Sequence, residues 1–266
     1  MVIMLSGKTN IIEAIFVCSL GKSFRTNKEK ELINMNVGAH ICAQIEIFAE
    51  KEDREIKIKY EQNDKKIFYI NNIKINKLSD ILGNIYTVLF TPEDIGILKN
   101  EPSKRRRFLN IIISQLRPAY IHSLNQYNKV LEQRNSYLKQ IKFEGKSSEI
   151  LDVWDEQLNN LGIKVFNYRK EFAEKINNKI KKIHLNSTSH QENIELIYKS
   201  KIKENYLEEL KKSRKIDIQK GYTNIGIHRD DIEIYINNQD VGIFGSQRTK
   251  KNKYYFFKIS RSRSYI

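Results

Sequence analysis

The sequence predicts an α/β fold, in which an antiparallel β subdomain is followed by an inserted α-helical hairpin arm. Three observations support this fold class. Apolar and polar residues alternate between residues 39 and 75, which is the period of half-buried strands. Apolar residues then recur mainly every three or four positions, within residues 116–141 and 154–183, as in amphipathic helices. Alternation returns at residues 231–236, so strands flank the helical arm.

The first predicted element is a helix over residues 8–20. Its residues are largely apolar, and we expect it to be buried on most sides. The alternating strands come next, and Asn71-Asn72 lies between the last two of them. This dipeptide is suited to a tight hairpin turn. The stretch is therefore predicted to be an antiparallel meander with one face in water.

Helices are predicted from about residue 91 onward. Thr91-Pro92-Glu93-Asp94 has a capping threonine, a proline at the first helical position and carboxylates in the first turn. Pro102-Ser103 indicates a second helix start. An apolar stripe then begins at Leu116, and the short polar link 145–148 separates it from the second stripe. The two stripes predict two long helices packed as an antiparallel hairpin.

The last predicted elements lead back to strands. A short strand at residues 194–198 and a helix near residues 203–215 precede the alternating residues 231–236, which end at Asn237-Asn238.

Composition limits the class of protein. The chain has 266 residues, is 40% hydrophobic and 30% charged, and contains no run of 18 apolar residues, so we expect no membrane span. The N-terminus leaves no room for a secretory signal before Gly7. Two cysteines, Cys18 and Cys42, cannot form a disulfide framework or a zinc cluster. We therefore expect a cytoplasmic protein.

The charge suggests a polyanionic partner. The formal net charge is +15, and the last 19 residues alone contain seven Lys or Arg and no acidic residue. The chain is also rich in Ile, Lys and Asn, a bias that AT-rich coding produces without any function. Net charge alone leaves both interpretations open.

One tripeptide carries the chemistry of phosphate binding. Gly7-Lys8-Thr9 precedes an apolar helix, as in the closing half of a phosphate-binding loop. Glycine allows the backbone to approach phosphates, lysine neutralises them, threonine offers a hydroxyl to magnesium, and the helix start presents free amides. The full pattern needs a glycine at position 2, which is Val2. A chance turn before a helix is the alternative.

Two further motifs have both a functional and a structural interpretation. Arg105, Arg106 and Arg107 lie about 100° apart around one predicted helix, so they cannot all face one DNA backbone. At least one of them could contact DNA or phosphate; otherwise they form a solvated or ion-paired face. His228-Arg229-Asp230-Asp231 could hold a metal or form a structural hydrogen-bond cluster, and no second histidine lies at ligand spacing. Trp154, the tyrosines of the stripes and Cys18 are interpreted as core.

Several long motifs, in order, resemble the RecF family of SMC-like, ABC-type ATPases. The resemblance covers residues 7 to 247. The motifs that carry it are Gly7-Lys8-Thr9-Asn10-Ile11-Ile12-Glu13-Ala14-Ile15, Gly21-Lys22-Ser23-Phe24-Arg25-Thr26, Leu89-Phe90-Thr91-Pro92-Glu93-Asp94, Leu98-Lys99, Pro102-Ser103-Lys104-Arg105-Arg106-Arg107-Phe108-Leu109, Tyr127-Asn128-Lys129-Val130-Leu131-Glu132-Gln133-Arg134-Asn135, Trp154-Asp155-Glu156-Gln157-Leu158, Gly226-Ile227-His228-Arg229-Asp230-Asp231 and Phe244-Gly245-Ser246-Gln247.

The resemblance implies an ABC-type ATPase head with an antiparallel β subdomain and a helical arm. It implies ATP and Mg as cofactors, with Lys8 at phosphate, Thr9 at magnesium and Ser246 at the ATP of a second subunit. The implied nucleotide site consists of Gly7, Lys8, Thr9, Asn10, Ser246 and Gln247. It also implies an ATP-dependent homodimer, recombination-mediator partners and binding to single-stranded or gapped duplex DNA, with recombinase loading in repair, replication restart and the SOS response.

On this basis we expect four regions: the first part of the head with the β meander (1–100), the helical arm (101–220), a return to the head (221–247) and a tail (248–266). The head is expected to be incomplete. Residues 248–266 contain no Asp or Glu, so the acidic Walker B strand of a weak ATPase is missing, and so is the strand before Gly7. We therefore expect no ATP turnover by this chain.

Back-translation suggests that both ends are read in a shifted frame. Codons for residues 1–6 can be chosen so that another frame, with one base dropped, reads GDNAQ before Gly7, which completes the phosphate loop. Codons for residues 248–253 can likewise hide GQKRT after Gln247, close to the family signature, and residues 260–265 can hide AEAEV. We expect a chain truncated at both ends. Two rival functions remain: another SMC-like ATPase, or a basic DNA-binding protein with no nucleotide role.

Overall fold

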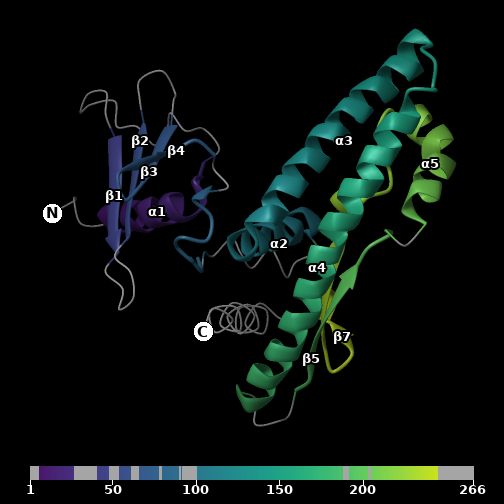
Figure 1. Cartoon of the computed structure of the whole chain (residues 1–266). Coiled ribbons are helices and arrows are strands. Elements are labelled where there is room, and N and C mark those ends of the chain that lie inside the picture. Colours follow the sequence, from purple (N-terminus) through teal and green to yellow (C-terminus); the bar gives the residue numbers. More distant parts are fainter. Residues whose placement is uncertain are drawn as a thin grey trace. The chain divides into compact units, whose positions relative to one another are not determined.

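A computed structural model describes residues 6–26, 41–47, 54–60, 66–77, 80–89, 91, 101–187, 192–202 and 205–244, and the description below refers to these residues (Figure 1). The chain divides into two compact units. Unit 1 comprises residues 1–89 and 114–118, and unit 2 comprises residues 90–113 and 119–266. The fold is mixed α/β, with two small antiparallel sheets and long helices.

Unit 1 contains one long helix and a four-stranded meander. Helix α1 spans Ser6–Leu20. The strands are β1 (Ile41–Ile47), β2 (Arg54–Tyr60), β3 (Lys66–Ile70) and β4 (Ile73–Ile75), paired antiparallel in chain order. Asn71 and Asn72 have φ of 49° and 63°, which is the left-handed backbone of a tight hairpin turn. The predicted meander and its last turn are confirmed.

The core of unit 1 forms between α1 and the sheet. It consists of Val17, Cys18, Ile56, Ile58, Phe68 and Ile81. Cys18 is fully buried, as its assignment to packing predicted. The prediction that α1 is buried on most sides holds for its last turn and fails for the turns before it, where Ile11, Ile12 and Ile15 are 63%, 47% and 40% exposed. The four consecutive residues Phe16, Val17, Cys18 and Ser19 are buried, so the last turn of α1 is covered on all sides, whereas the described side chains of its first turns, at residues 9–12, are exposed.

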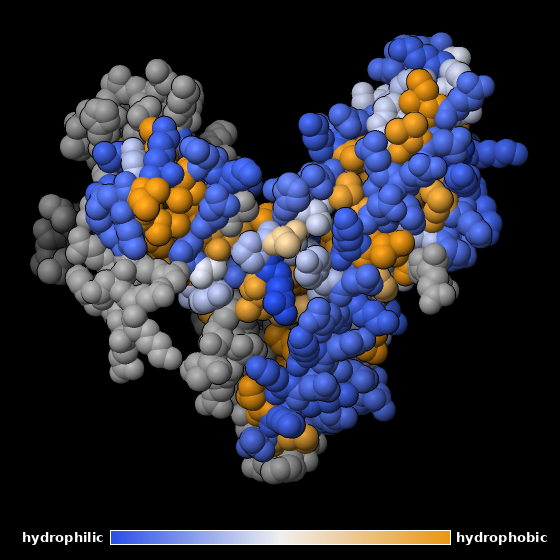
Figure 2. Space-filling view, viewed as in Figure 1, coloured by the Kyte–Doolittle hydropathy of each residue, from blue (hydrophilic) through white to orange (hydrophobic). Residues whose placement is uncertain are grey.

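The helical arm in unit 2 is confirmed as a hairpin of two long helices. Helix α3 (Pro118–Glu144) and helix α4 (Leu151–Ser187) run side by side, and the link around residues 145–148 joins them (Figure 1). Tyr120 and Tyr127 are fully buried, while the Trp154 ring contacts that of Tyr137, with centroids 4.8 Å apart and the ring planes tilted by 52°. In the view of Figure 2, most of the surface over these helices is hydrophilic.

One boundary of the arm differs from the prediction. Helix α2 spans Pro102–Leu116, as its predicted start at Pro102-Ser103 requires. Leu116 ends this helix instead of beginning the arm, because Pro118 opens α3 after a break at Arg117. Proline favours the first helical position and disrupts a helix interior. The helix start predicted at Thr91–Asp94 lies outside the described residues, apart from Thr91.

A second antiparallel sheet completes unit 2. Strands β5 (Ile194–Lys199), β6 (Asp231–Ile236) and β7 (Gln239–Asp240) pair in that order, and β5 packs against α4. Helix α5 spans Tyr206–Lys220 rather than 203–215, because Gly221, at φ 76°, caps its C-terminus. The turn η4 (Ile227–Arg229) precedes β6, and the short helix α6 (Val241–Phe244) follows β7.

In the described part of the chain, no helix is long and apolar enough to cross a membrane.

Candidate functional site

The predicted phosphate-binding residues lie at the start of α1. The helix begins at Ser6, so Gly7-Lys8-Thr9 forms its first turn. Thr9 and Asn10 are exposed, whereas the side chain of Lys8 lies outside the described part of the structure. The first N–H groups of a helix lack partners within it and attract anions. The start of α1 can therefore hold a phosphate group.

A basic side chain that the sequence analysis did not select lies beside this helix. Arg25 donates from Nη1 to Asn10 Oδ1 at 3.3 Å and to Glu13 Oε2 at 3.1 Å. The Ser23 hydroxyl donates to the other Glu13 oxygen and accepts the backbone N–H of Arg25 at 2.9 Å. Arg25 remains half-exposed, with 52% of its side-chain surface accessible.

The acidic residue Glu13 could have pointed to Arg25 as a residue near the start of α1. It is only 8% exposed, on an otherwise apolar helix face. A buried carboxylate requires a cation or several donors. The loop that follows the helix supplies the cation, Arg25, and a hydroxyl donor, Ser23. The Arg25 guanidinium therefore lies against Asn10, the residue that follows Thr9 in the chain.

The three consecutive arginines of α2 have different environments. Arg105 is buried and donates from Nε and Nη2 to the two oxygens of Asp231, each at 2.6 Å. Arg106 donates to the backbone oxygen of Asp230 at 2.9 Å, and burial lowers its pKa, helped by the charge of Arg169. Arg107 is exposed. Arg105 thus forms a bidentate ion pair with Asp231, and Arg107 faces solvent.

The motif His228-Arg229-Asp230-Asp231 forms a hydrogen-bond cluster. His228 contacts the Tyr127 hydroxyl through Nδ1 and the Thr223 carbonyl through Nε2, each at 3.0 Å. Burial lowers the pKa of His228 to about 4, so the ring is neutral at pH 7. The neutral ring with its proton on Nε2 satisfies both contacts.

Asp230 is enclosed by donors. It accepts from Arg169 Nη1 at 3.0 Å, from the Ser200 hydroxyl at 2.6 Å and from the Tyr198 hydroxyl. Among the described residues, no group of three His, Cys, Asp or Glu side chains could hold a metal ion.

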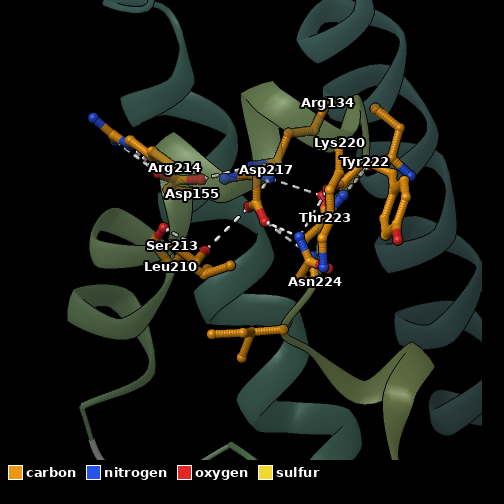
Figure 3. A network of polar contacts seen from close by, with 12 residues as sticks. Arg134, Asp155, Leu210, Ser213, Arg214, Asp217, Lys220, Tyr222, Thr223 and Asn224 are labelled. Atoms are coloured by element: carbon orange, nitrogen blue, oxygen red, sulfur yellow. Dashed lines mark hydrogen bonds and ion pairs between the residues drawn. The ribbon is translucent and has the colours of Figure 1, made fainter.

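A second buried network joins the helices of the arm (Figure 3). Arg134 on α3 is fully buried and donates from Nε to Asp155 on α4 and from Nη1 to Asp217 on α5, each at 2.8 Å. Its Nη1 also donates to the Thr223 hydroxyl at 2.8 Å, and Arg214 donates to Asp155 at 2.7 Å. This network is not predicted from the sequence, because charged residues normally lie on the surface.

The remaining predicted site residues lie elsewhere. Ser246, Gln247 and the tail 248–266 are outside the described residues. The expected division into regions at residues 100, 220 and 247 stays a prediction.

Known proteins resemble the chain along most of its length. It is 38% identical over 265 residues to the DNA replication and repair protein RecF of Acetivibrio thermocellus, a match covering 96% of this chain and 72% of that protein. It is 41% identical over 247 residues to RecF of Clostridium botulinum, covering 91% and 67%. It is 40% identical over 260 residues to RecF of Clostridium perfringens, covering 96% and 71%. No protein-family model matches the chain.

Two solved structures share the fold. The recombination mediator protein RecF with ATPγS, in the RecFOR pathway, has a TM-score of 0.91 and 34% identity, covering 97% of this chain and 72% of that one. The same protein with ATP has a TM-score of 0.87 and 34% identity, covering 96% and 71%. These matches confirm the resemblance inferred from the motifs of the sequence.

Proposed function

The chain belongs to the RecF family of DNA replication and repair proteins, and from this premise we propose that it binds ATP at the start of α1 and acts on DNA in recombinational repair. Two structures of a RecF protein were solved with ATP or ATPγS, which makes a nucleoside triphosphate the expected ligand.

The first turn of α1 supplies the groups that a triphosphate needs. In the proposed site, its free N–H groups would face the anion, Gly7 would let the backbone come close, and Lys8 would neutralise the β- and γ-phosphates. The exposed Thr9 presents its hydroxyl for magnesium, which would neutralise further phosphate charge when bound. Asn10 continues the exposed side of the turn and connects it to Arg25.

Arg25 adds a second positive charge at this end of the helix. Glu13, which accepts from the Ser23 hydroxyl, holds the guanidinium next to Asn10, and half of the side chain stays accessible. An arginine fixed in this way loses little conformational freedom when it contacts a phosphate. We assign it to the nucleotide site alongside Lys8.

Family membership supports the wider role. The relatives' description as recombination mediators suggests recombinase loading at single-stranded or gapped duplex DNA, replication restart and the SOS response. Ser246 would contact the ATP of a second subunit in an ATP-dependent homodimer, and Gln247 would belong to the same nucleotide site. Recombination-mediator proteins would be partners. Arg107 is the arginine of α2 available for DNA, because Arg105 and Arg106 are engaged within the fold.

Lys8→Ala tests the nucleotide site. The substitution removes the main counterion of the phosphates, so we expect the affinity for a fluorescent ATP analogue with Mg to fall about tenfold or more. The matched control is Lys74→Ala, which removes an exposed lysine from β4 in the same unit. It should bind like the parent.

Equal affinity of Lys8→Ala and the parent chain would refute the phosphate-loop assignment. DNA binding without any nucleotide binding by the parent would instead favour a basic DNA-binding protein with no nucleotide role.

A further inference from the structure

Two exposed aromatic rings with cations above them lie at the far end of the arm. Tyr222, in the loop after α5, is 39% exposed; the Arg229 guanidinium lies 5.3 Å and Lys220 Nζ lies 5.9 Å from its ring centroid. Phe143, near the end of α3, is 75% exposed, and Lys142 Nζ lies 5.1 Å from its centroid.

The two ring sites are neighbours. The stems of Lys139 and Lys142 pack against Gly221, the residue before Tyr222: a Cβ built on Gly221 would lie 3.4 Å from Lys139 Cγ and 3.9 Å from Lys142 Cδ. We call this surface the basic-aromatic patch. It consists of Lys139, Lys142, Phe143, Lys220, Tyr222 and Arg229.

The patch keeps its positive charge. Within the described residues, none of its four cations forms an ion pair with a carboxylate. The carboxylate of Asp217, at the nearby end of α5, is buried and accepts from Arg134. The cations are therefore available to an external anion.

The backbone beneath the patch is held firmly. Tyr222 donates its N–H to the Asp217 carbonyl at 3.2 Å, and Asn135 accepts both the N–H and the hydroxyl of Thr223 at 2.8 Å. In Figure 3 the Tyr222 ring points away from the Arg134 network. The network thus fixes the loop and leaves the ring facing outward, so a ligand would bind without ordering the loop first.

We propose that the basic-aromatic patch binds single-stranded DNA, with bases stacked on Tyr222 and Phe143 and phosphates at the four cations. Aromatic faces flanked by cations are the features that hold unpaired strands, because every base has a face to stack and every linkage has a charge. Bases within a duplex are already stacked and cannot use the rings. The proposal rests on the DNA-binding role above and assigns it to a surface.

The test is fluorescence anisotropy with a labelled oligo(dT) of 30 nucleotides and the full chain. Tyr222→Ala and Phe143→Ala should each weaken binding about tenfold by loss of stacking. Tyr222→Phe keeps the ring and should bind like the parent. Both side chains, Tyr222 and Phe143, are exposed, and circular dichroism checks that the three variants fold.

Salt dependence separates charge from stacking. Arg229→Gln should reduce the slope of log K against log salt by about 0.7, the value for one phosphate contact on a single strand. Tyr222→Ala should leave the slope unchanged. The charge-matched control is Lys179→Gln, an exposed lysine on the distant half of α4, which should change neither quantity.

The outcomes distinguish a failure of the patch as the binding surface from a failure of the DNA-binding role itself. If the parent binds oligo(dT) but the patch variants match Lys179→Gln, the patch is not the binding surface and the proposed DNA-binding role stands. If the variants lose duplex binding and keep oligo(dT) binding, the assignment to single strands is wrong. If the parent binds neither single-stranded nor duplex DNA, the patch proposal and the DNA-binding role both fail.

Discussion

Of the glycines in the described ranges, Gly226 leaves the least room for a side chain. Its φ of 147° is a conformation that side-chain-bearing residues rarely adopt. A Cβ at this position would overlap the Tyr127 hydroxyl and lie 2.7 Å from the Tyr206 hydroxyl. Both tyrosines are fully buried, so neither ring can move into solvent to make room.

We predict that Gly226→Ala lowers the free energy of unfolding by about 2 kcal/mol or more, from overlap and backbone strain together. The matched control is Gly145→Ala, at φ 69° with no atom within 4 Å of the new Cβ. It should cost about 1 kcal/mol, from backbone strain alone. Urea unfolding followed by circular dichroism measures both. Equal costs for the two variants would show that the tyrosines accommodate the methyl group.

For single residues, the sequence predicts the local structure where the residue type favours one backbone conformation. Asn71-Asn72 predicts a turn, because asparagine tolerates the left-handed backbone of a tight hairpin. Arg134 and Arg169 could not be predicted as buried, since arginine is mostly exposed and its buried partners come from distant segments. The same reason explains why Arg25, which depends on Glu13, was missed.

At the scale of elements, the Arg134 network joins the two helices of the arm, α3 and α4, to α5. Its guanidinium contacts a carboxylate on α4 and another on α5, and all three side chains are fully buried. Removing the arginine leaves Asp217 with neutral donors only, Ser213 and Asn224. Asp155 would still accept a hydrogen bond from Arg214 after this change. A buried carboxylate without its cation is strongly destabilising.

We predict that Arg134→Met lowers the free energy of unfolding by about 3–5 kcal/mol, despite the similar size of methionine. Lys175→Met is the control, because it breaks the exposed pair with Glu171 on α4 and should cost less than about 0.5 kcal/mol. The fluorescence of Trp154, the single tryptophan, reports on the arm directly, since it adjoins Asp155. Similar urea midpoints for both variants would mean that the buried network is not needed to hold the arm.

Periodicity predicted the elements better than their ends. The alternating and helical patterns correctly located the meander, the hairpin of α3 and α4, and strands β5 and β6. The break before Pro118 was missed because the apolar stripe continues through it. The exposure of Ile11 was missed because an apolar helix indicates burial without showing what covers each face.

At the scale of the molecule, the two compact units carry different chemistry. Unit 1 contains the start of α1 with Thr9, Asn10 and Arg25, which is the proposed nucleotide site. Unit 2 contains the arm and the basic-aromatic patch. If both assignments hold, ATP and DNA are bound by separate units.

Hydrogen exchange of the full chain can therefore assign each ligand to its unit. A ligand protects the amides that it contacts and those whose local opening it suppresses. We predict that ATP with Mg slows exchange in residues 6–26, where the start of α1 and the Arg25 loop provide the contacts. Oligo(dT) should slow exchange in residues 139–144 and 218–229, around the patch. Lys8→Ala should abolish the first effect and keep the second, and Tyr222→Ala with Phe143→Ala should do the reverse. Protection of the patch by ATP, without protection of α1, would place the nucleotide on the arm and refute both assignments.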